Sequence, residues 1–180
     1  MAWYLDRMPR PGQTALVLPV PAADPLLAAV AARYPDAVRE GLPAHLTVLY
    51  PFVPADELDA SVMQACAQIV RGIAPITVRF TRCQVRPELI YLPPEPADQV
   101  QRLLEEVWAR WPALLPYGGK YADASAHVSV ALGAQAVDQD AIVSLVEPLL
   151  PITTQLSELH VAALGEDGWG IRSRLPFGGR

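Results

Sequence analysis

Two stretches of the chain join a run of aliphatic residues to a histidine and a hydroxyl residue at the same spacing. The first is Ala44–Phe52, AHLTVLYPF, and the second is Ala126–Leu132, AHVSVAL. Both are rich in β-branched and aliphatic residues, which predicts strands whose alternate side chains point to opposite faces. Each strand would bury its aliphatic side in a core and present its imidazole and its hydroxyl on the other side.

The shared spacing distinguishes these histidines from isolated ones. His45 and Thr47 would share one face of the first strand, and His127 and Ser129 one face of the second, about 6.5 Å apart along each strand. A lone strand histidine is more often structural than functional. However, two of the three histidines in the chain carry a hydroxyl residue at the second following position. His160 lacks this partner, and we expect it to be structural.

The remaining pattern alternates helices and strands without a linker, which predicts a single domain over residues 1–180. Amphipathic helices are expected over Asp24–Pro35, with Asp24 as its N-cap, Asp56–Gly72, Ala97–Trp111 and Asp138–Leu150. Further strands are expected over Thr14–Val20, Ile76–Val85, Leu89–Leu92, Gln155–Leu164 and Trp169–Leu175. The second and third of these strands, and likewise the last two, are predicted to form hairpins.

Length and composition narrow the class of protein. A chain of 180 residues can bury a core without a disulfide or a structural metal. Its two cysteines form no metal-binding or redox motif, which favours a reducing compartment. The N-terminal residues contain no long apolar run, so we expect neither a signal peptide nor a membrane anchor, and a cytoplasmic protein. With a net charge of −5, any nucleic acid must bind a local patch.

A glycine-rich loop, LPYGGKYADA, leads into the second histidine strand. Gly118 and Gly119 allow the backbone to approach a ligand closely, and Lys120 supplies a cation. Tyr117 and Tyr121 offer flat faces on which a base could stack. An ordinary turn is the alternative, but the position just before a motif histidine favours a substrate loop. The spacing of a P-loop is absent.

Three arginines, Arg79, Arg82 and Arg86, lie in the predicted hairpin near residue 85. They could lie on a solvated sheet face, or they could contact a phosphate or a sugar. The sequence leaves both possibilities open.

Two imidazoles can act as the general base and the general acid of one reaction, which suits the cleavage of a phosphodiester. The hydroxyls beside them are too weakly acidic to be nucleophiles without an adjacent base, and are better suited to hydrogen-bonding phosphoryl oxygens. The chain contains no GxSxG, no HExxH, no carboxylate cluster for magnesium and no dinucleotide fingerprint. We therefore expect neither a metal nor a cofactor.

The segments HLTVLYPF and HVSVAL, with PYGGK ahead of the second, resemble the paired H-x-[T/S]-x motifs of the two-histidine phosphoesterases. That superfamily contains the bacterial 2'-5' RNA ligase-like proteins and cyclic nucleotide phosphodiesterases. The resemblance implies a bilobal α+β fold in which two antiparallel sheets, each backed by helices, enclose a central groove. It also implies metal-independent opening of 2',3'-cyclic phosphates to 2'-phosphates, with at most weak ligase activity. Two departures, Ser129 where threonine is commoner and Ala126 where proline is frequent, alter the motif little.

By this resemblance, His45 and His127 would be the acid and base, and Thr47 and Ser129 the phosphate ligands. The resemblance favours His127 as the group that activates water and His45 as the group that protonates the leaving 3'-oxygen. The expected substrate contacts are Tyr50, Phe52, Tyr91, Tyr117, Gly118, Gly119 and Lys120. The expected partners are RNA ends with a cyclic phosphate or small cyclic nucleotides, bound by a monomer without an obligate protein partner. The alternative is a non-catalytic RNA or nucleotide-binding module that uses the same groove.

Overall fold

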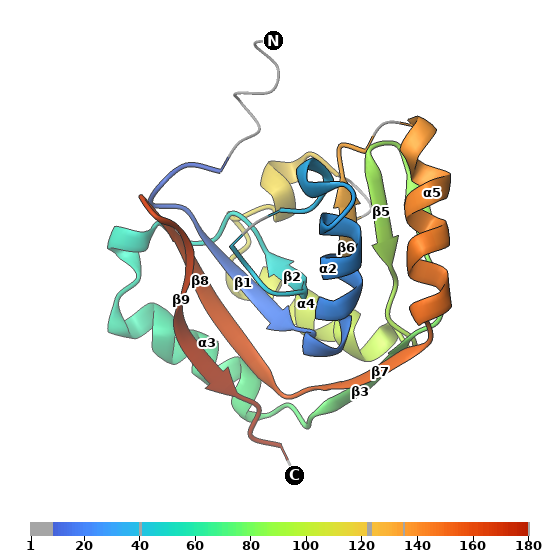
Figure 1. The fold of residues 1–180 in the computed structure, drawn as a ribbon. Helices are drawn as coiled ribbons and strands as arrows, with labels where there is room; N and C mark the ends of the chain where they lie inside the picture. The colour runs from blue at the N-terminus through green and yellow to red at the C-terminus, as the bar shows by residue number, and fades with distance from the viewer. Residues whose placement is uncertain (1–8, 40, 122–123, 135, 180) are drawn as a thin grey trace.

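The computed structural model describes residues 9–39, 41–121, 124–134 and 136–179 (Figure 1). Its helices are α2 (Asp24–Ala31), α3 (Ala60–Arg71), α4 (Asp98–Arg110) and α5 (Ala136–Val146). Its strands are β1 (Thr14–Pro19), β2 (His45–Leu49), β3 (Ile76–Phe80), β4 (Gln84–Arg86), β5 (Leu89–Leu92), β6 (Val128–Leu132), β7 (Ile152–Leu156), β8 (Glu158–Gly165) and β9 (Gly168–Pro176). None of the helices in these ranges is long and apolar enough to cross a membrane.

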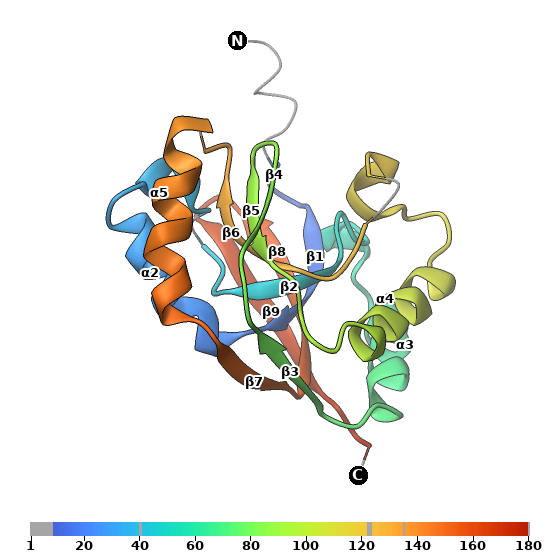
Figure 2. The same ribbon diagram turned by 90° about the vertical axis from the view of Figure 1, so that its right-hand side faces the viewer.

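The strands form one large and one small antiparallel sheet. The large sheet has seven strands in the order β4-β5-β6-β2-β1-β8-β9, and β3 pairs with β7 in the second sheet. Figure 2 shows α2 and α5 on one side of the strands and α3 and α4 on the other. The predicted α+β class with two antiparallel sheets is confirmed. The structure adds that both histidine strands, β2 and β6, are neighbours at the centre of the larger sheet.

The predicted aliphatic faces of the motif strands lie in the core. Leu46 and Val48 of β2 and Val128 and Val130 of β6 are each at most 1 % exposed. Full burial of such a side chain contributes about 1.5–3 kcal/mol. Helix α4 packs against β2, and the indole Nε1 of Trp108 donates a hydrogen bond to the Val48 carbonyl oxygen at 2.8 Å. The burial of one face leaves the opposite face of both strands for the imidazoles and hydroxyls.

Asp24 does not act as the predicted helix cap. It is the first residue of α2, and its carboxylate oxygen Oδ1 accepts a hydrogen bond at 2.7 Å from the backbone N–H of Ala44. The Ala44 carbonyl oxygen in turn accepts from the Val20 N–H at 2.7 Å. Asp24 therefore fixes the chain just before His45, a role that depends on contacts 20 residues away in sequence.

The second helix, α3, begins later than predicted. Helix α3 starts at Ala60, and Asp59 caps it, because Asp59 Oδ1 accepts hydrogen bonds at 2.9 Å from the N–H groups of Ser61 and Val62. Two aspartates, Asp56 and Asp59, precede this helix, and only the second is followed by the regular apolar stripe of the helix. The closing hairpin predicted from residues 155–175 is present as β8 and β9.

The predicted hairpin of residues 76–92 is only partly correct. Residues 76–80 alternate in burial as expected, but they form β3 and pair with β7, while the hairpin itself is the shorter pair β4 and β5. On the other edge of β3, the backbones of Arg79 and Glu95 exchange two hydrogen bonds of 2.8 Å. Alternation predicts that a strand exists, but its partner is decided by the whole fold.

Candidate active site

The two motifs lie side by side on antiparallel strands. The middle residues of the motifs, Leu46 and Val128, are directly opposite each other in the register of β2 and β6. In an antiparallel pair, one step along either strand then places each motif histidine beside the hydroxyl residue of the other motif. Side chains opposite each other in this way have Cβ atoms roughly 4.5–5.5 Å apart. The two imidazoles and two hydroxyls thus form a four-cornered group with the histidines on one diagonal.

Both imidazoles are held by the same local hydrogen bond. His45 Nδ1 lies 2.7 Å from the carbonyl oxygen of Pro43, and His127 Nδ1 lies 2.7 Å from that of Ser125. A carbonyl oxygen can only accept, so Nδ1 carries the hydrogen in each ring. Nε2 is consequently the atom that gains or loses a proton in both histidines.

The surroundings lower the pKa of both histidines below its usual value. Burial is the main cause for His45, whose pKa is also lowered by the positive charges of Arg39 and of a protonated His127 and raised by its carbonyl bond. Burial is likewise the main cause for His127, where Arg86 adds a further lowering. Because the charged imidazoles repel each other, the pair holds one proton more readily than two.

The glycine-rich loop is anchored to the end of β2. Tyr117, Gly118 and Gly119 have positive φ angles of 53°, 65° and 76°, a conformation that two glycines adopt without steric cost and that tyrosine adopts rarely. The backbone N–H of Tyr117 donates a hydrogen bond to the Tyr50 carbonyl oxygen. This turn directs the Tyr117 side chain back towards the first motif.

Tyr117 reaches the site, whereas Lys120 lies further out. The Tyr117 hydroxyl shares a hydrogen bond with Thr47, and burial raises the pKa of this phenol. The Tyr117 ring meets Tyr121 edge to face at 5.5 Å between centroids. Lys120 is exposed, with Nζ 5.4 Å from the centre of the Tyr121 ring. The loop thus contributes one partly buried phenol, one exposed aromatic ring and one cation.

Tyr91 lies beside the second motif. In the register of β5 and β6 it is opposite Ser129, and its ring lies edge-on to the His127 imidazole at 5.3 Å between centroids. Its hydroxyl donates a hydrogen bond to Gln84 Oε1 at 2.6 Å. Tyr91 is therefore a fixed wall of the site next to one catalytic candidate.

The other two predicted aromatic contacts differ from each other. Tyr50 is half-buried, and its hydroxyl donates to Gln13 Oε1 at 2.8 Å. Phe52 is only 3 % exposed and packs edge-on against Trp111 at 4.9 Å. The structure thus places Phe52 in the core, where its ring cannot meet a substrate. The short apolar run after the motif gave no signal to separate a core ring from a site ring.

The arginines also separate in space. Arg79 is in the small sheet, opposite Thr153 of β7, and Arg82 is exposed between β3 and β4. Arg86, by contrast, lies over the Tyr91 ring, with Cζ 5.4 Å from its centroid. Arg39, which the sequence motifs do not include, also acts on the site, because its charge lowers the pKa values of His45, Tyr50 and Tyr117. Arg39 belongs to no motif, so no signal in the chain could have identified it.

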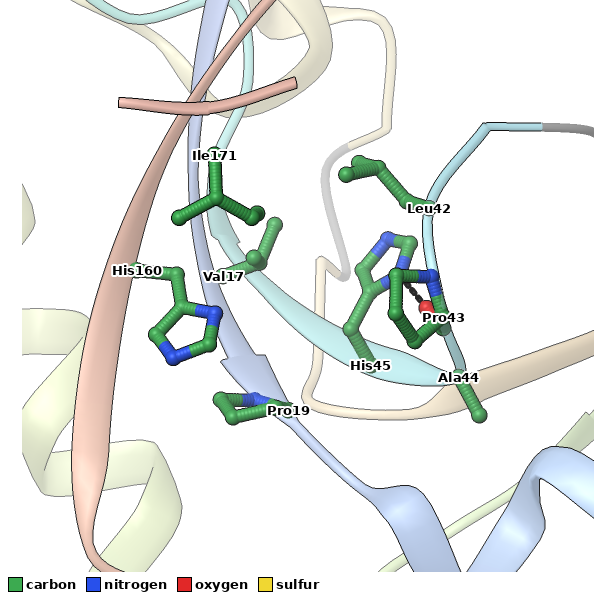
Figure 3. A pocket seen from close by; sticks show the side chains of 8 residues that line it. All are labelled: Val17, Pro19, Leu42, Pro43, Ala44, His45, His160 and Ile171. Atoms are coloured by element: carbon green, nitrogen blue, oxygen red, sulfur yellow. Dashed lines mark hydrogen bonds between the residues drawn. The ribbon is translucent and has the colours of Figure 1, made fainter. Parts of the chain in front are cut away.

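His160 lies beyond the motif pair on the same sheet. It is 8 % exposed and lies opposite Val17 of β1, with Nε2 3.0 Å from Glu158 Oε1 but without the alignment of a hydrogen bond. Figure 3 shows His160 and His45 lining one small, mainly apolar cavity. Its volume of about 10 Å³ suits at most one water molecule. We keep His160 outside the candidate catalytic group.

In the ranges that the structure describes, no group of three or more histidine, cysteine, aspartate or glutamate side chains is placed to hold a metal ion. The groups available for chemistry at the site are thus imidazoles, hydroxyls and nearby cations.

Several solved structures are similar to this chain in fold. TT0787 of Thermus thermophilus shares 16 % identity with a TM-score of 0.56, over 93 % of this chain and 99 % of that one. LigT of E. coli, solved with 3'-AMP, shares 17 % identity with a TM-score of 0.54, over 94 % of this chain and 99 % of that one. No curated protein matches the chain.

The family comparison covers both motifs. The model of the 2'-5' RNA ligase superfamily matches residues 18–168, which include β2, β6 and the glycine-rich loop. Since this match spans well over half of the chain, the protein belongs to the 2'-5' RNA ligase superfamily, a group of two-histidine phosphoesterases and ligases.

Proposed function

We propose that this protein hydrolyses 2',3'-cyclic phosphates of RNA ends or small nucleotides to 2'-phosphates, without a metal. One observation carries the proposal. Both motif histidines donate Nδ1–H to a carbonyl oxygen two residues earlier, so each Nε2 is the titrating atom, with the hydroxyl of the other motif beside the ring. A pair of imidazoles that prefers a single shared proton is suited to supply one acid and one base.

In the proposed reaction, one neutral imidazole takes a proton from water as the water oxygen bonds to phosphorus. The bond between phosphorus and the 3'-oxygen breaks, and the protonated imidazole gives its proton to that oxygen. The product carries a 2'-phosphate and a free 3'-hydroxyl, and proton exchange with solvent restores the pair. We assign water activation to His127 and protonation of the 3'-oxygen to His45, following the family resemblance. Each transfer typically contributes ~10² to 10⁴ in rate.

Thr47 and Ser129 stabilise the charge that develops on the phosphoryl oxygens in this proposal. Each hydroxyl lies beside an imidazole, and a donor already aimed at the developing charge needs no reorganisation during the reaction. The interaction between the Tyr117 and Thr47 hydroxyls restricts the rotation of the Thr47 side chain. A 5'-hydroxyl in place of water would yield a 2'-5' phosphodiester, so we expect weak ligation from the same groups.

The test is a panel of nucleoside 2',3'-cyclic phosphates and short RNAs with cyclic phosphate ends, assayed with and without excess EDTA. We expect turnover that chelation leaves unchanged and a product with its phosphate on the 2'-oxygen. His45→Ala and His127→Ala serve as matched controls and should be nearly inactive. Loss of turnover in EDTA, restored by one divalent metal, would contradict the mechanism. Tight binding of the whole panel without turnover would instead indicate a binding module.

A further inference from the structure

The sheet face that carries the motifs extends as far as the edge strand β4. Ser129 of β6 is opposite Tyr91 of β5, and Tyr91 is opposite Gln84 of β4. Residues that are opposite in adjacent strands share a face, and so do residues two apart in one strand. Arg86 follows Gln84 by two residues and therefore lies on the motif face, at the edge of the sheet.

A chain of contacts holds Arg86 at a set position relative to the second motif. Its guanidinium lies over the Tyr91 ring at 5.4 Å, and that ring meets His127 edge-on at 5.3 Å. The ring cannot swing away easily, because Tyr91 is 6 % exposed and its hydroxyl is bonded to Gln84. Stacking of a guanidinium on an aromatic ring leaves the N–H groups at its edge available to other partners.

Arg86 is an exposed residue. Among the residues that the structure describes, no carboxylate forms an ion pair with Arg86. Its charge nevertheless reaches the site, since it lowers the pKa of His127. In a protein of net charge −5, a cation on the motif face is the kind of local patch that an anionic substrate requires.

The position of Arg86 is beside the reacting phosphate and not at it. The cyclic phosphate would lie over the two imidazoles and two hydroxyls, and Tyr91 stands between this group and Arg86. A planar guanidinium binds phosphate oxygens in pairs, more tightly than a single neutral donor does.

We propose that Arg86 binds a second phosphate of the substrate, so that the site prefers cyclic phosphates that carry a further phosphate group. This inference rests on the proposed function. The second phosphate can be the 5'-phosphate of a mononucleotide or the internucleotide phosphate of an RNA end. Both present the same oxygens to Arg86, and the experiment separates them.

The experiment compares kcat/KM for three substrates: adenosine 2',3'-cyclic phosphate, the same compound with a 5'-phosphate, and a dinucleotide with a 2',3'-cyclic phosphate end. The unmodified protein should prefer one or both of the phosphorylated substrates by about tenfold or more. Arg86→Gln should reduce that ratio to about one. Arg82→Gln is the matched control, because Arg82 is an exposed arginine that lies before β4, outside the paired strands β4 and β5, and it should keep the ratio.

Two results would overturn the proposal. One is the absence of any preference in the unmodified protein. The other is an equal fall in kcat/KM for all three substrates in Arg86→Gln, together with a shifted pH profile. That result would mean that Arg86 acts only through His127. If no cyclic phosphate is turned over, the proposed function fails, and calorimetric titration with adenosine 2'-phosphate and adenosine 2',5'-bisphosphate still tests Arg86. Tighter binding of the bisphosphate that Arg86→Gln abolishes supports the second-phosphate site, and equal affinities refute it.

Discussion

The hydroxyl of Tyr117 shares a hydrogen bond with the hydroxyl of Thr47, although the two residues are far apart in the sequence. The contact depends on the positive φ of Tyr117 and on the backbone hydrogen bond from Tyr117 to Tyr50. A strained backbone at such a position is a frequent feature of functional sites. The orientation of the Thr47 side chain therefore depends on the glycine-rich loop as well as on strand β2.

Removal of this contact should slow the chemistry. Tyr117→Phe keeps the ring but leaves Thr47 without its partner, so we expect kcat to fall by about tenfold, the equivalent of a hydrogen bond of roughly 1.4 kcal/mol. Tyr117→Ala also removes the ring and should raise KM in addition. Steady-state kinetics on a cyclic phosphate measure both constants. Tyr121→Phe is the control, and a Tyr117→Phe protein with unchanged kcat would contradict the role of the hydroxyl.

Lys120→Ala should raise KM several-fold and change kcat by less than about twofold, because a cation that positions the substrate contributes to binding and not to proton transfer. Lys120 is exposed and lies over Tyr121, outside the group of imidazoles and hydroxyls. The effect on KM should also weaken at high salt. If kcat collapsed while KM stayed constant, Lys120 would have to be counted among the catalytic residues.

The pH dependence of kcat/KM should be bell-shaped, with its optimum on the acidic side of 6.5, the usual pKa of histidine. The base must be neutral, which sets the acidic limb, and the acid must be protonated, which sets the alkaline limb. Burial lowers the pKa of both His45 and His127, so both limbs move to lower pH. A bound phosphate favours the protonated imidazole, and the optimum of kcat should therefore lie higher than that of kcat/KM. A kcat/KM optimum above about pH 7.5 would be inconsistent with these shifts.

The same lowered pKa values should make the fold less stable in mild acid. Between the lowered folded pKa and the unfolded value of 6.5, the unfolded chain binds more protons than the folded one. The contribution of the two histidines to the free energy of unfolding is therefore complete above pH 6.5, and it declines as the pH falls from 6.5 through the lowered folded pKa values. Urea unfolding at several pH values between about 7.5 and 5 measures it. The doubly substituted protein His45→Gln, His127→Gln should lose less stability over this range than the unmodified protein, and identical slopes would refute the linkage.

The two histidines can be told apart by the leaving group. His45→Ala and His127→Ala should each cost roughly 10² to 10⁴ in rate, and the double substitution much less than the product of the two. A phosphodiester with a nitrophenolate leaving group needs little help from an acid. It should therefore restore much of the rate of His45→Ala but not of His127→Ala. Rescue of His127→Ala alone would reverse the assignment, and full activity of either variant on the natural substrate would exclude the two-histidine mechanism.

The sequence by itself determined which side chains share a face. The period of two placed each histidine with its hydroxyl residue, and the burial of Leu46, Val48, Val128 and Val130 confirms the opposite face as core. The sequence also predicted the apolar stripe of α4, because the periods of helices and strands follow from local backbone geometry. The glycine pair of the loop was also informative, because few other residues adopt its backbone conformation.

Only the tertiary structure decided which strands from distant parts of the chain are neighbours. The antiparallel pairing of Leu46 with Val128 creates the four-cornered group, and the pairing of β3 with β7 separates Arg79 from Arg86. Phe52 likewise lies in the core because it packs against Trp111, a residue from another part of the chain. Contacts between segments that are distant in the sequence set the strand partners, the register and the packing of rings. The local alternation of apolar and polar residues does not depend on those contacts, so it cannot predict them.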